Sequence, residues 1–283
     1  MLNTTELAID AFVKHLQEGY RRTYGGYKLD YAEILSWAGN MALENIANSD
    51  ALYHNVNHTI LVTLVGQEIL RGKHIREGGV SSEDWLHYSL ALLCHDIGYV
   101  KGVCRADGNG HYATGVATPA ITLAAGATDA SLTPYHVDRG KLFVQERFGG
   151  HKLIDVERLK EAIEPTRFPV PIAGEGGDPI SYPGLVRAAD LIGQLSDPRY
   201  LKRIPALFYE FEETGVNEKL GYKNPGDLRQ NYPKFYWGSI YPYIKHSLKY
   251  LTLTQAGQQI KANLYANVFV VEHENQDGAA AAL

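Results

Sequence analysis

Apolar residues recur every three or four positions along most of the chain, the spacing that places them on one face of an α-helix. The pattern predicts an amphipathic N-terminal helix over 1–17 and one or two final helices over 243–274. Further helices are predicted over 31–47, 58–70, 81–96, 132–148, 184–197 and 200–213. Two glycine-rich stretches, 102–119 and 174–184, break the pattern and are expected to be long loops.

Polar residues mark the expected starts of two of these helices. Ser81 or Ser82, followed by acidic residues, is the predicted N-cap of the helix over 81–96. Thr133 is the predicted cap of the helix over 132–148, with Pro134 at its first helical position. Periodicity and capping together predict an all-α fold.

The helices are expected to form one domain over residues 1–283. Its core is predicted at about 30–200, and 201–275 is a candidate C-terminal helical subdomain. A chain of 283 residues is long enough to bury a sizeable core. We see no internal repeat, low-complexity linker or charge run that would divide it further.

Composition narrows the class of protein. Apolar residues make up 45% and charged residues 21%, which is typical of a soluble globular protein. The formal net charge is −5 and there is no basic block, so non-specific nucleic-acid binding is not favoured. The two cysteines, Cys94 and Cys104, form no disulfide framework, and no run approaches the roughly 18 apolar residues of a membrane span. A cytoplasmic protein without a membrane partner is expected.

The first candidate chemistry is a pair of histidines, His54 and His58. Four residues apart, they share a face if both lie at a helix start. Zinc proteases use this spacing with a glutamate directly after the first histidine, but Asn55 stands there and the general base is missing. A metal-binding pair and a pair of locally bonded or surface histidines both fit the pattern.

A His–Asp doublet closes the apolar helix predicted over 81–96. On that helix Leu92 lies three residues before His95 and four before Asp96, so both side chains lie next to Leu92 on the helix surface. Both can therefore flank one point on the side that faces the core. An unpaired buried charge is costly, and a divalent cation would accept both an imidazole and a carboxylate. A pair that caps the helix end or faces solvent is the alternative.

A further carboxylate, Asp190, lies in an apolar helical stretch. Ala188 and Ala189 precede it and permit close helix packing. A buried carboxylate needs a cation, so Arg187 and a metal ion are the two candidate partners.

Three segments taken in order resemble the HD superfamily of metal-dependent phosphohydrolases. They are "YHNVNHTILV", "ALLCHDIGY" and "VRAADLIGQL", within about half of the chain. The resemblance implies an all-α HD-domain-like helical bundle, here with additional N- and C-terminal helices. It also implies a divalent metal held by His58, His95, Asp96 and Asp190. One or two ions of Mn, Fe, Mg, Ni or Zn are expected, and the sequence does not choose among them.

The same resemblance suggests catalytic roles. "HNVNH" is similar to the HNxxH stretch of cyclic-nucleotide phosphodiesterases, in which the first histidine protonates the leaving oxygen, so His54 becomes the candidate general acid. Asp96 or Asp190 would orient the attacking water. Tyr99 stands near the place where those phosphodiesterases carry a further histidine, and no single subfamily is secured.

Four more residues are candidates for a second metal or a phosphate contact: His136, His111, Arg139 and Lys101. The two histidines lie between the doublet and Asp190, where dinuclear HD relatives hold their second ion. The positive end of the helix dipole is expected to keep His136 neutral. The alternative for all four is a locally bonded or surface side chain.

The resemblance predicts hydrolysis of a phosphate ester of a nucleotide or another small molecule, monoester or diester. The alternative is a catalytically silent HD-like module that binds a nucleotide or metal as a regulator. A helical scaffold with incidental histidines is a third reading, and it predicts no bound metal. A homodimer is expected only from the general frequency of dimers among soluble proteins.

Overall fold

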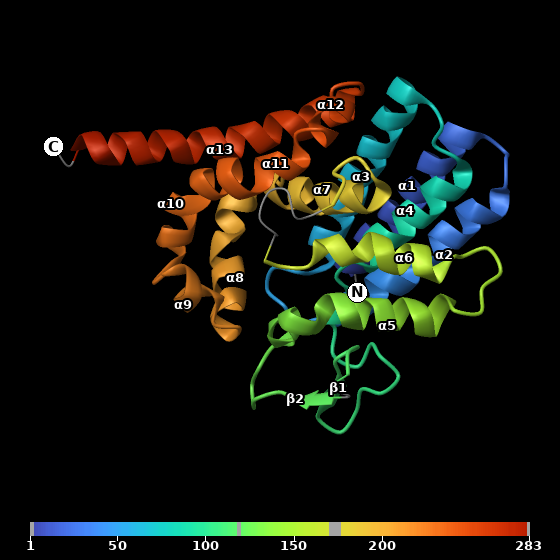
Figure 1. Ribbon diagram of the computed structural model, residues 1–283, viewed down its shortest axis with the longest axis horizontal. Coiled ribbons are helices and arrows are strands. Elements are labelled where there is room, and N and C mark those ends of the chain that lie inside the picture. The colour runs from blue at the N-terminus through green and yellow to red at the C-terminus, as the bar shows by residue number, and fades with distance from the viewer. Residues whose placement is uncertain (1–2, 118–119, 170–176, 282–283) are drawn as a thin grey trace.

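The computed structural model describes residues 3–117, 120–169 and 177–281, and part of the predicted loop over 174–184 lies outside them. Helices dominate, which confirms the all-α class (Figure 1). The first half contains α1 (Thr4–Tyr24), α2 (Leu29–Ile46), α3 (Val56–Glu77), α4 (Ser82–Cys94), α5 (His136–Phe148) and α6 (Val156–Ile163). The second half contains α7 (Tyr182–Leu195), α8 (Tyr200–Glu213), α9 (Val216–Leu220), α10 (Pro225–Phe235), α11 (Tyr241–Ile244), α12 (Ser247–Leu251) and α13 (Gln255–Ala281).

Short elements connect these helices. Three 3-10 segments, η1 (Ile97–Tyr99), η2 (Asp129–Tyr135) and η3 (Glu164–Thr166), follow α4, precede α5 and follow α6, and a π-helical turn, η4 (Tyr236–Ile240), follows α10. The predicted loop over 102–119 contains β1 (His111–Ala113), which pairs antiparallel with β2 (Ala120–Thr122). Within the described part of the chain, no helix is long and apolar enough to cross a membrane.

Helix starts follow the sequence in one case and depart from it in another. The sequence offered Ser81 or Ser82 as the N-cap of α4, and Ser81 is the cap. It forms a capping box with Asp84. Thr133 does not cap α5, because its hydroxyl donates to the Ala130 carbonyl inside η2 and the α-helix begins only at His136. The proline that was expected to open the helix therefore lies in a 3-10 turn.

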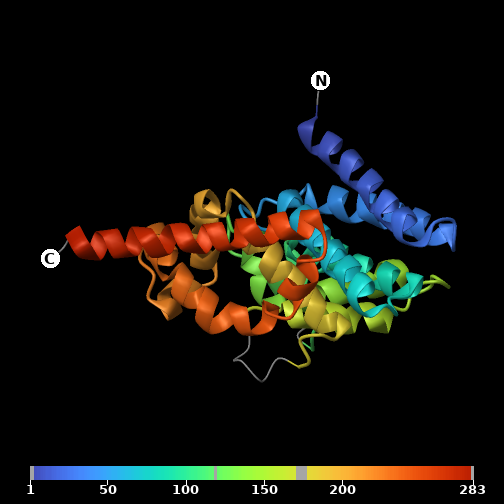
Figure 2. The ribbon, with the colours of Figure 1, turned by 90° about the horizontal axis from the view of Figure 1, so that it is seen from above.

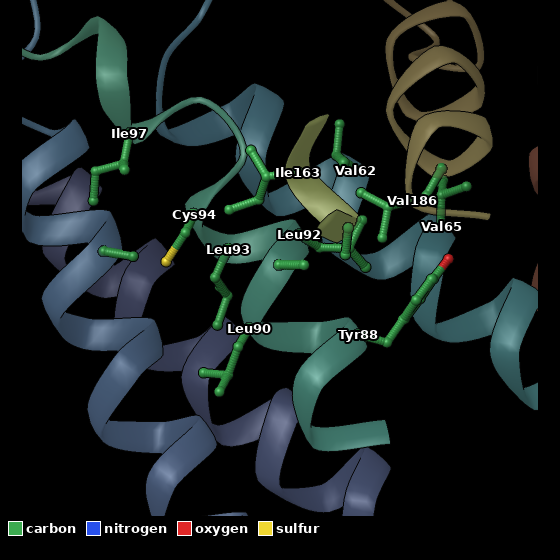
Figure 3. Packing of buried hydrophobic residues seen from close by; sticks show 14 of the residues in the cluster. Val62, Val65, Tyr88, Leu90, Leu92, Leu93, Cys94, Ile97, Ile163 and Val186 are labelled. Carbon is green, nitrogen blue, oxygen red and sulfur yellow. The ribbon is translucent and has the colours of Figure 1, made fainter. Parts of the chain in front are cut away.

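The core is closely packed where α3 crosses α7. Figure 3 shows Val62 of α3, Leu92 of α4 and Val186 of α7 gathered there, and all three are fully buried. A Cβ on Gly193 of α7 would lie 2.7 Å from the Val62 Cα of α3, and one on Gly66 of α3 would lie 3.2 Å from the Ala189 Cβ of α7. Small residues therefore let the two backbones touch.

A second close approach fixes the segment after α4. A Cβ on Gly98 would lie 1.8 Å from the carbonyl oxygen of His136, so η1 packs directly against the first turn of α5. The segment that follows the His–Asp doublet is thus held against the backbone of α5.

The remaining helices frame this core. α1 packs along α2, and its N-terminal end projects from the body of the molecule (Figure 2). Helices α8, α9 and α10 gather at the opposite end, while α12 packs on α3 (Figure 1). The long α13 runs from α12 across α10 (Figures 1 and 2). There Arg229 of α10 pairs with Glu274 of α13 at 2.8 Å.

The crossing of α3 and α7 yields a test of packing. We expect Gly193→Ala to lower the free energy of unfolding by about 1–3 kcal/mol, because the added methyl group meets backbone atoms of Val62. Gly238→Ala is the matched control, since a Cβ there has no atom within 4 Å. Urea denaturation measures both variants, and equal effects would contradict this account of the crossing.

Candidate metal centre

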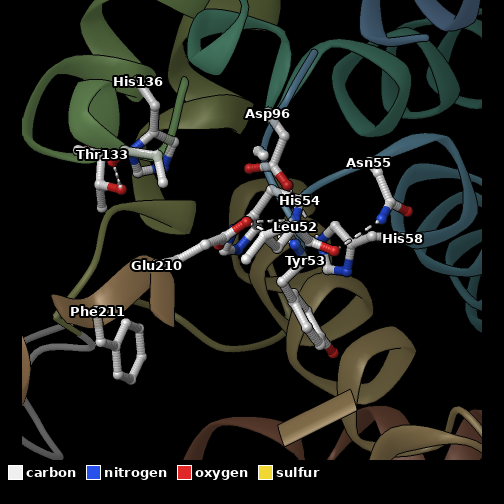
Figure 4. A network of polar contacts seen from close by, with 12 residues as sticks. Leu52, Tyr53, His54, Asn55, His58, Asp96, Thr133, His136, Glu210 and Phe211 are labelled. Carbon is white, nitrogen blue, oxygen red and sulfur yellow. Dashed lines mark hydrogen bonds and ion pairs between the residues drawn. The ribbon is translucent and has the colours of Figure 1, made fainter. Parts of the chain in front are cut away.

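Four side chains from three separate segments converge on one point. His58 comes from the first turn of α3, His95 and Asp96 follow α4, and Asp190 comes from α7. Asp96 Oδ2 lies 3.1 Å from Nε2 of both histidines, and Asp190 Oδ1 lies 3.4 Å from His58 Nε2 and 3.6 Å from His95 Nε2. The two Nε2 atoms are 3.4 Å apart. Figure 4 shows His58 and Asp96 from close by.

The hydrogen bonds of the site leave lone pairs on His95 Nε2 and Asp96 Oδ2 available to a cation. His95 Nδ1 lies 2.7 Å from the Leu92 carbonyl, which can only accept, so Nδ1 carries the hydrogen and a neutral ring presents a lone pair at Nε2. Among the described residues, no hydrogen bond of ordinary geometry reaches Asp96 Oδ2, although it is buried and near both rings. A buried oxygen without such a partner calls for a cation.

The donor set suits a divalent transition metal. His58, His95 and Asp190 offer one ligand atom each within 4.8 Å of one another, and so do His54, His58 and Asp96. Imidazole nitrogens together with carboxylate oxygens are ligands for zinc, iron, nickel and manganese. The residues present therefore fit the predicted ion.

The electrostatic field of the centre also favours a cation. Burial opposes a charge on His95, but Asp96 and Asp190 outweigh it and raise its pKa well above the usual value. Burial likewise opposes ionisation of Asp96, yet His95 and His58 hold the pKa of its carboxyl well below the usual value. The two carboxylates thus stabilise positive charge between the rings.

A carboxylate that the sequence analysis missed, Glu210 of α8, orients His54. Glu210 Oε2 lies 2.5 Å from His54 Nδ1, while Oε1 accepts from the backbone N–H groups of Tyr53 and His54 (Figure 4). Burial opposes protonation of His54, but Glu210 outweighs it and raises the pKa to about 9. The signal available in the sequence was an acidic residue on the apolar side of α8, where Leu207 and Phe208 are also buried.

Another residue of α8 holds the loop before α3. Arg203 donates to the Tyr53 carbonyl at 2.9 Å, and its guanidinium lies 4.6 Å from the centre of the Tyr53 ring. Arg203 is itself paired with the buried Asp197 at 3.1 Å. The position of His54, just before the Asn55 cap of α3, therefore depends on a helix about 150 residues later in the chain.

Three rings stack beside the centre. Tyr99 lies between His54 and His136, with 4.6 Å between ring centres on each side. His136 Nδ1 is bonded to the Thr133 carbonyl at 2.6 Å, and burial lowers the pKa of this histidine. The predicted neutral ring is thus found, but burial is its main cause. His136 belongs to neither group of described metal donors.

Three other candidates lie away from the site. The Arg139 guanidinium is fully buried and bonded to Asp107 and to three backbone carbonyls, so it has no access to a phosphate. Lys101 donates to the Ala127 carbonyl at 2.7 Å, and His111 is exposed on β1, next to Thr122. These contacts are structural, because the loop after η1 is folded against α5 and η2.

A pocket opens beside the centre. His54, Asp96, Asp190, Glu210 and His136 line its inner end. Its walls come from α7, the segment after α6 and the helices after residue 200. A ligand in this pocket would therefore meet the metal donors and the His54–Glu210 pair together.

Comparison with protein families matches residues 2–274 to the Npun_R2479-like family, and the chain therefore belongs to that family. Comparisons with curated proteins and with solved structures give no match.

Burial of Arg139 gives a test of its role. We expect Arg139→Met to lower stability by about 3–5 kcal/mol, because it leaves the Asp107 carboxylate buried without its partner. Adding Asp107→Asn should restore part of this loss, since no buried charge then remains. Thermal denaturation measures both. If Arg139→Met instead left stability unchanged and weakened phosphate binding, Arg139 would be a phosphate contact and not a structural residue.

Proposed function

We propose that this Npun_R2479-like protein is a metal-dependent phosphohydrolase of the HD type, with His58, His95, Asp96 and Asp190 as ligands of a divalent ion. The observation that carries the proposal is the convergence of these four donors beside a histidine that is itself paired with a carboxylate. The reaction is hydrolysis of a phosphate ester of a nucleotide or another small molecule.

A bound divalent ion supplies Lewis acidity that activates water and neutralises charge on the phosphoryl oxygens. The chain itself performs the remaining tasks. Asp96 and Asp190 are held ionised beside the imidazoles, so their oxygens can accept hydrogen bonds from the attacking water and orient it. Burial of the site keeps these interactions strong.

Proton transfer falls to His54. Its Nδ1 is bonded to Glu210, so Nε2 remains for the substrate, and the raised pKa keeps the ring protonated at neutral pH. A protonated ring at the inner end of the pocket is suited to donate to the leaving oxygen. Glu210 fixes the ring orientation and stabilises the imidazolium before transfer.

The His54–Glu210 pair also favours catalysis over a silent regulatory module. A buried carboxylate bonded to Nδ1 stabilises the protonated form of His54, which is the form that a proton donor needs and that a metal ligand does not have. The side chain of Glu210 is 2% exposed, and such burial costs free energy that the pairing with His54 offsets.

The compartment belongs to the proposal as well. Cys94 and Cys104 are both buried free thiols. We place the protein in the cytoplasm, where a reducing environment keeps thiols free.

Removal of a ligand tests the centre. Loss of a residue that only hydrogen bonds a metal ligand typically weakens metal binding by roughly 10–100-fold. We expect His58→Ala and Asp96→Ala each to weaken it by more than this, because they remove ligands. His111→Ala is the control, because that side chain is exposed and outside the pocket. Elemental analysis of the purified proteins and titration with Mn²⁺, Ni²⁺ and Zn²⁺ provide the measurement. Full metal content in His58→Ala would refute the ligand assignment.

The proton donor has its own test. His54→Ala should keep the metal and lower kcat by about 10²–10⁴-fold. Glu210→Gln should lower kcat with little change in KM, and it should cause no further loss when added to His54→Ala, because it acts through that ring. Glu218→Gln, at an exposed position of α9, is the control. Additive losses would show that Glu210 acts independently of His54.

A further inference from the structure

The pocket beside the metal centre continues into a chamber built by the helices that follow α6. Its walls include Leu191 of α7, Leu207 and Phe211 of α8, and Leu228, Tyr232 and Phe235 of α10. The ring of Phe211 stacks on Phe168, another residue of the pocket lining, with 5.3 Å between ring centres. Figure 4 shows Phe211 apart from the cluster around His54 and Glu210. The pocket therefore has a polar inner end and an apolar body.

Polar side chains in the chamber wall are bonded within the protein. The Thr166 hydroxyl donates to the Ile163 carbonyl at 2.8 Å, and Asn231 Nδ2 donates to the Asp227 carbonyl at 2.9 Å. Gln194 hydrogen bonds the Tyr200 hydroxyl. These three groups have their partners in the fold, whereas the buried Tyr232 hydroxyl has no hydrogen-bond partner among the described residues. Apart from this hydroxyl, the walls offer a ligand mainly apolar contact.

The two arginines of the chamber wall also interact with other side chains of the protein. Arg167 forms a two-pronged pair with Asp138, at 2.8 and 2.9 Å, and also bonds Glu164. The Arg187 guanidinium lies 4.2 Å from the centre of the Tyr243 ring. A nucleotide would need hydrogen bonds to its base and ribose and free cations for additional phosphates. The chamber is better suited to an uncharged apolar group.

Resting on the proposed function, we infer that the substrate is a phosphate ester of an apolar alcohol, alkyl or aryl, whose tail fills this chamber. The ester phosphorus lies at the inner end, and the ester oxygen faces His54. The water oxygen bonds to phosphorus as the bond from phosphorus to the alcohol oxygen breaks. That oxygen takes the proton of His54, and the proton released by the attacking water returns the ring to its protonated form. The net products are the alcohol and inorganic phosphate.

Binding of neutral alcohols tests the chamber apart from catalysis. With the full chain as purified, calorimetry with 1-butanol, 1-hexanol and 1-octanol should show affinity rising about three- to fourfold per methylene, the factor that about 0.8 kcal/mol per buried CH₂ gives. Leu228→Trp, which fills the chamber, should weaken 1-octanol binding at least about tenfold by this scale. Leu153→Trp, at an exposed site outside the pocket, should not. Affinity that is independent of chain length, or unaffected by Leu228→Trp, overturns the inference.

Turnover separates this inference from the proposed function. The metal-loaded protein should release phosphate from octyl phosphate with kcat/KM at least about tenfold above that for ethyl phosphate or adenosine 5′-monophosphate, as several buried methylenes imply. Hydrolysis without that preference, or with preference for the nucleotide, overturns the apolar substrate and leaves the phosphohydrolase standing. Chain-length-dependent alcohol binding without hydrolysis of any ester refutes the phosphohydrolase and supports only the apolar chamber.

Discussion

Two imidazole nitrogens and two carboxylate oxygens meet within 3.1–3.6 Å inside the protein, and the rest of the structure serves this convergence. Such donors repel one another unless positive charge lies between them. Bringing them together requires three backbone segments to approach more closely than ordinary side chains allow. Gly66 and Gly193 permit this where α3 crosses α7, and Gly98 permits it where the segment after α4 meets α5. Core packing and site chemistry are therefore one constraint.

The helices after residue 200 are part of the site as well as an addition to the core. Glu210 and Arg203 of α8 reach back to the loop before α3 and set the position of His54. The same region supplies Phe211 and Phe235 to the chamber wall. This part of the chain thus both positions His54 and lines the chamber beside the metal donors.

Much of this could be predicted from the sequence, for identifiable reasons. Regular apolar spacing predicted most of the longer helices but not α6, α9 or α10, which are short or carry few apolar residues. The placement of His58, His95, Asp96 and Asp190 in apolar helical stretches predicted a shared buried point. Glu210 could not be found in this way, because its partner lies 156 residues earlier and nothing in its local pattern names that partner. The role of Arg139 stayed open in the sequence, because a cation on a helix looks the same whether it faces a ligand or a buried carboxylate such as Asp107.

The stack of His54, Tyr99 and His136 illustrates how surroundings divide roles between two identical side chains. Both imidazoles lie against Tyr99, and burial disfavours a charge on each. His54 bonds through Nδ1 to a carboxylate, which outweighs burial and keeps the ring protonated, whereas His136 bonds through Nδ1 to a neutral carbonyl and burial prevails. The pKa of His54 is therefore raised while that of His136 is lowered, although the two rings stack on the same tyrosine. In the proposed reaction, the proton for the leaving oxygen would accordingly come from the side of the Tyr99 ring on which Glu210 lies.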